Sequence, residues 1–251
     1  MSAVISSCIA DFQIQQNGQC FPLYWYETVD NAEGSLFDSS PTHLVRRDGI
    51  TDFILKQARS LYGERVTKED IFYYVYGFLH LPAYRKEFAA DLKKSLPRIM
   101  LVDEPKKFWQ IEKAGRDLAD IHLHYEGQPA TDGVVIEGAE SGNFRVQKLK
   151  FPSKDDRSTI IYNENIRITG IPERAYEYVV NGKSPVEWIM DRYRVTVDKA
   201  SGIENDPNKW GEEHGNPRYI LDLIMSVITV SLKTLDIVDA LPEVSFEQTS
   251  D

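Results

Sequence analysis

The stretch Pro217-Arg-Tyr-Ile-Leu-Asp-Leu-Ile-Met-Ser-Val-Ile-Thr-Val-Ser-Leu-Lys-Thr-Leu-Asp-Ile-Val-Asp239 is the clearest structural signal in the 251-residue sequence. Its apolar side chains recur at the three- and four-residue spacing that gives a helix one continuous apolar face. Because Asn216 followed by a proline is a typical helix start, we expect a long helix over 217–239 that closes the fold. The expected apolar face consists of Ile220, Leu223, Ile224, Val227, Ile228, Leu232 and Leu235.

The part of the chain before this helix alternates short apolar runs with turn-forming residues, which predicts an antiparallel sheet. Ser184-Pro-Val-Glu187 combines an N-cap, a proline at the first helical position and a capping-box acid, so a short helix should run from there to about residue 193. Residues 198–216 are rich in Asp, Asn and Gly and are expected to form a loop. The expected strands are 143–151, 158–162, 166–169 and 175–180.

The first half of the chain is predicted to be mainly helical, after a strand over 20–27 and a polar loop over 30–40. Its expected helices are 48–62, 67–80, 82–95 and 105–125. The fold class is therefore α+β, with a helical N-terminal half, an antiparallel β-rich middle and a long C-terminal helix. We expect four parts: a lead-in segment over 1–18, a mainly helical part over 19–128, a β-rich recognition part with the closing helix over 129–240, and a polar tail over 241–251.

Composition indicates a soluble globular protein, with 42% hydrophobic and 27% charged residues. The apolar runs fall far short of the roughly 18 uncharged residues that a membrane span needs, and the N-terminus has no secretory signal pattern. Two cysteines, Cys8 and Cys20, cannot build a disulfide framework. We therefore expect a cytoplasmic protein without a membrane partner.

Charge is unevenly distributed along the chain, although the net charge is −10. Residues 84–116 carry nine basic and five acidic side chains, and residues 142–200 carry eleven and eight. The segments around them are acidic. A positive face on an acidic body suits a protein that binds DNA at chosen sites, but from charge alone ordinary surface scatter is the favoured explanation.

Motifs for catalysis are sparse, so we expect no cofactor. Gly182-Lys183-Ser184 lacks the upstream glycine of a phosphate-binding loop, since Glu177 stands there. Asp120 and His124 lie one helical turn apart and could share a metal ion, but no further ligand is placed by the sequence. A metal-dependent hydrolase is therefore a minor alternative.

Basic residues in the expected strand 143–151 are the first candidates for a DNA contact. Arg145, Lys148 and Lys150 would project from a β-ribbon, which can reach phosphates or base edges in the major groove. A solvated strand face is an equal alternative.

Several multi-residue strings, in order along residues 19–240, are similar to those of one known family. They are Gln19-Cys-Phe-Pro22, Ile71-Phe-Tyr-Tyr-Val-Tyr-Gly-Phe-Leu-His80, Tyr84-Arg85, Leu92-Lys-Lys-Ser-Leu-Pro-Arg-Ile99, Gly115-Arg-Asp-Leu-Ala-Asp120 with His122, Tyr162-Asn163, Tyr176-Glu-Tyr-Val-Val-Asn-Gly-Lys-Ser184 with Glu187-Trp188, Asp198-Lys199, Ser201-Gly-Ile203, Asn205-Asp-Pro-Asn208 and Pro217-Arg-Tyr-Ile220. Through these strings the chain resembles the C-terminal specificity domain of type ISP restriction-modification enzymes.

The resemblance implies a function. In that family one polypeptide carries a nuclease, an ATP-driven translocase, an adenine methyltransferase and this target-recognition domain. The chain should then recognise a short sequence in double-stranded DNA, without catalysis or cofactor of its own, for methyltransferase and translocase/nuclease modules present in cis or in trans.

The matching strings add Lys183, Lys199, Asn205 and Asn208 to the candidate DNA-binding residues. A turn-forming role for the two asparagines is at least as good an interpretation. The alternative function is a docking module for a DNA methyltransferase, which would use the helices over 105–125 and 217–239 and make little direct DNA contact.

Overall fold

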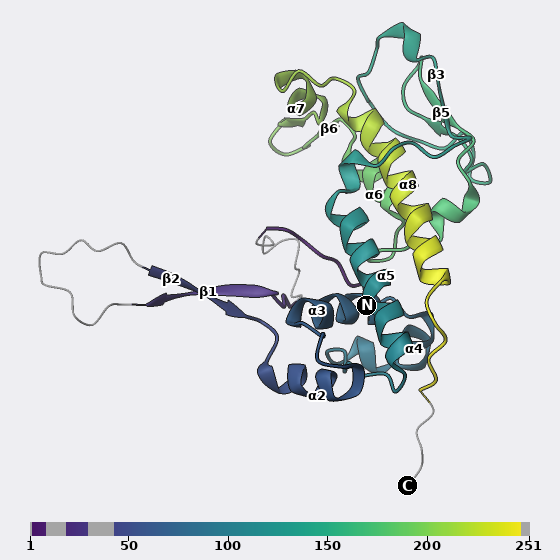
Figure 1. The fold of residues 1–251 in the computed structure, drawn as a ribbon. Coiled ribbons are helices and arrows are strands. Elements are labelled where there is room, and N and C mark those ends of the chain that lie inside the picture. Colours follow the sequence, from purple (N-terminus) through teal and green to yellow (C-terminus); the bar gives the residue numbers. More distant parts are fainter. Residues whose placement is uncertain (1, 9–18, 30–42, 247–251) are drawn as a thin grey trace, which may run out of the picture. The chain divides into compact units, whose positions relative to one another are not determined.

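The long closing helix is present as α8 (Tyr219–Asp239), in a computed structural model that describes residues 2–8, 19–29 and 43–246 (Figure 1). The expected loop over 30–40 lies outside the described residues. The chain divides into two compact units. The N-terminal unit comprises Ile5–Ala119 and Leu241–Asp251, and the C-terminal unit comprises Met1–Val4 and Asp120–Ala240.

The core of the C-terminal unit is built around α8, whose predicted apolar face is buried from Ile220 to Ile228, while Leu232 and Leu235 nearer its end are partly buried. Helix α6 (Pro185–Arg192) and the 3₁₀ helix η4 (Glu173–Tyr176) pack against α8. A small antiparallel sheet adds Ile160 and Ile168, and Ile166 just before its last strand along the chain joins them, all three with no exposed surface. Its strand order is β3 (Val135–Glu137), β5 (Arg167–Thr169), β4 (Ile160–Ile161). The start of α8 differs from expectation, because Arg218 and not Asn216 is its N-cap residue.

Two of the expected strands are absent from this unit. Residues 143–151 form no strand, apart from an isolated bridge between Lys150 and Ile161. Residues 175–180 begin inside η4 and continue as a turn. The apolar residues of both segments, Val146, Leu149, Ala175 and Tyr176 among them, still enter the core. The alternating apolar pattern therefore predicted correctly that these residues are buried. It predicted wrongly that the two segments pair as strands.

The expected loop over 198–216 contains regular structure. Strands β6 (Thr196–Val197) and β7 (Glu204–Asn205) form a short antiparallel hairpin, and α7 (Asn208–Glu213) follows it. Asp198 stabilises the hairpin turn, since its Oδ1 accepts hydrogen bonds from the backbone of Ala200 and from Ser201. These turn-forming side chains allowed a hairpin where the sequence indicated only a loop.

The N-terminal unit begins with an antiparallel ribbon of β1 (Tyr24–Val29) and β2 (His43–Asp48), which extends from the helices (Figure 1). The second strand was not expected. Helix α2 (Asp52–Tyr62) starts after Thr51, whose side chain caps it, and not at Asp48. Lys68 joins the ribbon to α2, because its Nζ lies 2.8 Å from an Asp48 oxygen and 2.6 Å from one of Asp52.

Helices α3 (Lys68–Phe78), α4 (Pro82–Glu87) and α5 (Pro105–Leu123) follow, with the 3₁₀ helix η1 (Asp91–Lys93) between the last two. The expected helix over 82–95 is wrong in length, since α4 ends at Glu87. Helix α3 approaches α5 closely at Gly77, where an added Cβ would overlap the carbonyl oxygen of Ile111. This unit has its own core, in which Tyr62, Tyr74 and Phe108 stack.

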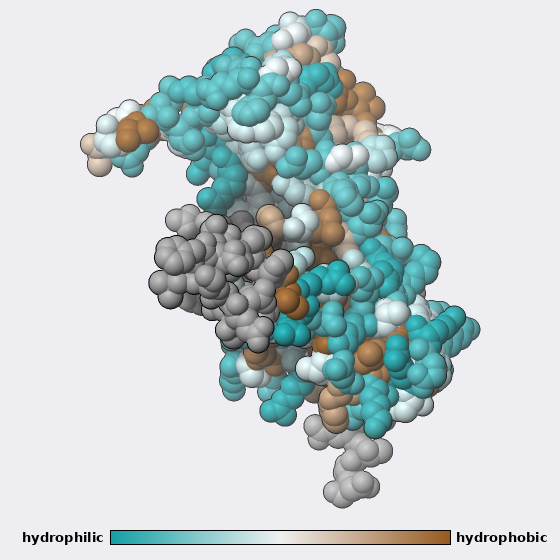
Figure 2. Space-filling view, turned by 60° about the vertical axis from the view of Figure 1, so that its left-hand side comes forward, coloured by the Kyte–Doolittle hydropathy of each residue, from teal (hydrophilic) through white to brown (hydrophobic). Residues whose placement is uncertain are grey.

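Together these elements confirm the α+β class and its order of a helical first half, a β-containing middle and a long last helix. None of the helices in the described ranges combines the length and apolarity that crossing a membrane requires. On the face shown in Figure 2, hydrophilic residues dominate and hydrophobic ones form small separate groups.

Candidate nucleic-acid interface

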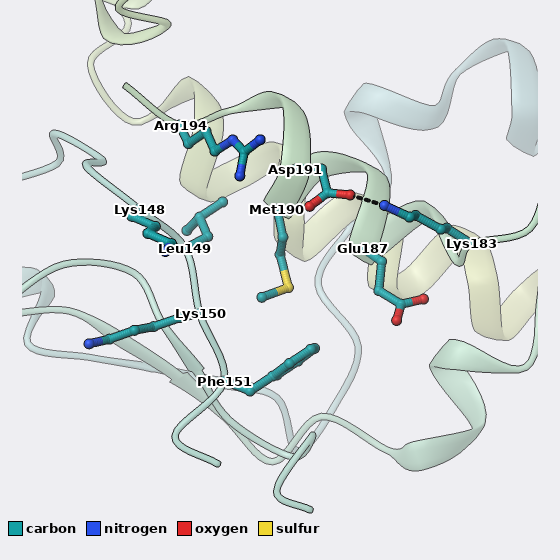
Figure 3. A pocket seen from close by; sticks show the side chains of 9 residues that line it. All are labelled: Lys148, Leu149, Lys150, Phe151, Lys183, Glu187, Met190, Asp191 and Arg194. Atoms are coloured by element: carbon teal, nitrogen blue, oxygen red, sulfur yellow. Dashed lines mark hydrogen bonds and ion pairs between the residues drawn. The ribbon is translucent and has the colours of Figure 1, made fainter. Parts of the chain in front are cut away.

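A hollow of about 340 Å³ lies in the C-terminal unit, between residues 148–151 and helix α6 (Figure 3). It brings together three of the predicted DNA-binding residues, Lys148, Lys150 and Lys183, with Arg194. Sequence reasoning missed Arg194, which follows α6 directly. The only available signal was its place in the basic stretch 142–200. The remaining lining residues are Leu149, Phe151, Glu187, Met190 and Asp191.

The charges around the hollow leave an excess of cations. Lys183 forms an ion pair with Asp191, and Glu187 is bonded to Arg157 at 2.6 Å between Oε1 and the guanidinium. Within the described part of the chain, no ion pair is present for the other three basic lining residues, Lys148, Lys150 and Arg194. The hollow is therefore positively charged and open to an anion.

The acid Glu187 is held ionised by its own local structure. Burial opposes its charge, but hydrogen bonds from the backbone and hydroxyl of Ser184, with the charges of Arg157 and Lys183, outweigh burial and lower its pKa. The same bonds form the capping box that the sequence predicted at the start of α6. Glu187 is thus part of the support of the hollow.

Lys183 is placed by a tight turn. Asn181 and Gly182 both have positive φ, at 51° and 88°, and Val180 and Lys183 form an antiparallel bridge across them. This is the pattern of a two-residue hairpin turn, for which Asn-Gly is the favoured sequence. The turn sets Lys183 next to the capped start of α6, while Ser184 itself is fully buried.

Side-chain amides, one buried and one half-buried, fix the segment 143–151 in place of strand pairing. Asn208 accepts a hydrogen bond from the Val146 N–H at 2.8 Å and donates one to the Val146 carbonyl, also at 2.8 Å. Asn163 donates to the carbonyls of Asn143 and Arg145. The candidate Asn208 is only 6% exposed. The structure therefore gives its amide a role in holding the backbone that carries Lys148 and Lys150.

Arg145 is engaged in a surface ion-pair network. Its guanidinium bonds Glu212, and at 2.5 Å the buried carboxylate of Asp206. The hydrogen bond that Arg145 donates to Glu212 is the main cause that raises the pKa of Arg145. The network connects the segment 143–151 with α7, so Arg145 has acidic partners of a kind that, among the described residues, Lys148, Lys150 and Arg194 lack.

Lys199 and Asn205 lie away from the residues that line the hollow, on the β6–β7 hairpin, and both are exposed. The hairpin adjoins the hollow through its base, since the Val195 N–H donates to the Gln147 carbonyl at 3.0 Å. Two acids, Asp198 and Glu204, accompany Lys199 on it. The positive charge of this unit is therefore concentrated at the hollow and not on the hairpin.

The metal site that Asp120 and His124 could form gains no third ligand among the described residues. His124 Nδ1 contacts the Asp120 backbone at 2.9 Å and its carboxylate at 3.1 Å, and both side chains are exposed. No cluster of three or more metal-ligating side chains occurs among the residues that the structure describes. The apolar face of α8, proposed as a docking surface in the alternative function, is buried inside its own unit.

The C-terminal unit thus combines a small mixed core with a hollow that basic side chains surround. The chain belongs to the family of Type ISP C-terminal specificity domains, whose family model matches residues 1–223. This confirms the resemblance found in the sequence.

Solved structures of similar proteins agree with this assignment. The chain is 43% identical to the ATP-dependent Type ISP restriction-modification enzyme LlaBIII bound to DNA, with a TM-score of 0.75 over 90% of this chain. It is 48% identical to a nuclease-deletion mutant of the Type ISP enzyme LlaGI in complex with a DNA substrate mimic, with a TM-score of 0.66 over 79% of this chain. The DrdV–DNA complex is 28% identical, with a TM-score of 0.65 over 78% of this chain.

These relatives are much longer than the present chain, which spans 14% of LlaBIII, 14% of LlaGI and 20% of DrdV. A search of curated proteins found no match.

Proposed function

We propose that this chain recognises a short sequence in double-stranded DNA for a larger restriction-modification enzyme and performs no catalysis itself. The observation that carries the proposal is the cationic hollow, in a chain of a specificity-domain family whose solved relatives are bound to DNA. A concentration of unpaired basic side chains is the feature that phosphate binding needs.

The DNA contacts divide into two kinds. Lys148, Lys150 and Arg194 contact phosphates and set the position of the duplex. Lys199 and Asn205 on the exposed hairpin are the side chains available for base edges, while Lys183 lines the hollow and is paired with Asp191. Arg145 and Asn208 act through the backbone they hold, in the network with Asp206 and Glu212 and in the bonds to Val146.

The catalytic partners are, in this proposal, methyltransferase and translocase/nuclease modules joined to the chain in cis or supplied in trans. The small share of each relative that the chain spans supports this division. The recognition role is assigned to the part of the chain over 129–240.

A selection from a random duplex library at physiological salt tests the function directly. Enrichment of one short motif by the purified chain is the expected result. Salt-sensitive retention without enrichment would show that sequence reading needs the methyltransferase module, and the selection is then repeated with that module attached. Absence of enrichment in both forms would refute sequence recognition.

The double variant Lys148→Ala/Lys150→Ala tests the interface. Each lost phosphate contact should lower the slope of log affinity against log salt by about 1, at every sequence tested. Lys154→Ala is the matched control, because Lys154 is an exposed lysine of the same segment that does not line the hollow. An unchanged slope in the double variant would remove residues 148–150 from the DNA contact.

A further inference from the structure

We propose that the hollow binds a single nucleotide turned out of the double helix, with its base on the apolar floor and its phosphate at the cationic rim. The inference rests on the proposed function and names the ligand that the site receives. It differs from simple backbone binding, which a convex basic surface can provide.

The floor of the hollow supplies the first argument. Leu149 and Met190 are 4% and 8% exposed, and Phe151 is half-buried. Figure 3 shows Met190 and Phe151 pointing toward the centre of the hollow. Phosphate contacts need no apolar recess, whereas a base removed from its stack needs apolar or aromatic surface to replace its neighbours.

The rim supplies the second argument. Arg194 points toward the hollow, while Lys150 extends outward (Figure 3). Arginine has a planar guanidinium that bonds phosphate through two N–H groups at once, and the outward lysine is free to meet the next phosphate along the strand. On the opposite side Lys183 is engaged by Asp191. The phosphate of the bound nucleotide therefore belongs on the Arg194 side.

The volume of the hollow limits the size of the ligand that it can bind. About 340 Å³ is at the lower end of small-ligand sites, which suits one nucleotide unit and not a run of strand. Met190 is an unbranched, polarizable side chain that adapts to ligands of different shape. The hollow should therefore accept purines and pyrimidines alike, and base identity is read elsewhere.

The test uses duplexes of the selected sequence with the fluorescent base 2-aminopurine at each position in turn. Binding should raise its fluorescence several-fold at one position, where unstacking occurs. A mismatch at that position should raise affinity about tenfold, because the base is already unpaired and turning it out costs less. Arg194→Ala should remove the mismatch preference, while Lys154→Ala should keep it.

Phe151→Leu keeps the floor apolar but removes the aromatic face, so it should reduce the mismatch preference without changing the salt slope. Duplex binding with no fluorescent position, or a mismatch preference that Arg194→Ala leaves intact, would overturn the nucleotide site and leave the proposed function standing. Absence of any duplex binding, with or without the methyltransferase module, would overturn both.

Discussion

The substitution Asn208→Ala should destabilise the C-terminal unit strongly although it removes only one small side chain. The Asn208 amide bonds both backbone groups of Val146, each at 2.8 Å, and donates to Asp206 at 2.6 Å. Val146 is 1% exposed, so water cannot easily replace the lost partners. Each orphaned buried group costs about 1–3 kcal/mol, and we expect a loss on the order of 2–4 kcal/mol in the free energy of unfolding.

Urea denaturation followed by tryptophan fluorescence measures this loss, and hydrogen exchange at the Val146 amide locates it. Asn205→Ala, at an exposed position three residues earlier, is the control and should stay within about 0.5 kcal/mol of wild type. A similarly small effect for Asn208→Ala, with Val146 still protected from exchange, would refute the clamp. The folded variant should keep the wild-type salt slope of DNA binding, since no phosphate contact is lost.

Two further predictions concern packing and pH. Gly77→Ala should cost about 2–3 kcal/mol of stability, because its new methyl group meets the backbone of Ile111, whereas Gly127→Ala, in open space, should have little effect in the same urea assay. Burial lowers the pKa of His122 from 6.5 to about 4. Between these two pH values, His122 is therefore protonated in the unfolded state and neutral in the folded state. Stability should therefore fall as pH falls through that window, by about 2 kcal/mol between pH 7 and pH 5. In His122→Gln, which retains a donor for Thr234, this part of the pH dependence should vanish, and an unaltered pH dependence would show that His122 is not responsible.

The helices were predictable where local signals coincide with the core. The apolar face of α8 and the Ser184–Glu187 capping box each depend on residues close in sequence, so their spacing identified them. Prediction was wrong at the end of α4 and at residues 143–151 and 175–180. At residues 143–151 the backbone is fixed by the distant partners Asn163 and Asn208, which no local pattern reveals.

The candidate site was predictable in composition and not in geometry. Lys148, Lys150 and Lys183 lie around one hollow, whereas the sequence predicted Lys148 and Lys150 on a strand. Asn208 was selected for its family string, and only the structure shows that its amide faces inward. Arg194 could not be singled out, because its proximity to Lys148 depends on how α6 packs beside a segment some forty positions earlier.

The side-chain clamps on residues 143–151 have a consequence for how such a domain changes its target during evolution. In a paired strand, an insertion or deletion of one residue reverses the direction of every later side chain. A segment held at a few points by side-chain amides has no such register, so the stretches between the clamps can lengthen, shorten or exchange side chains independently. Under the proposed function, new DNA specificities can then arise by small steps, with the core around α8 left untouched.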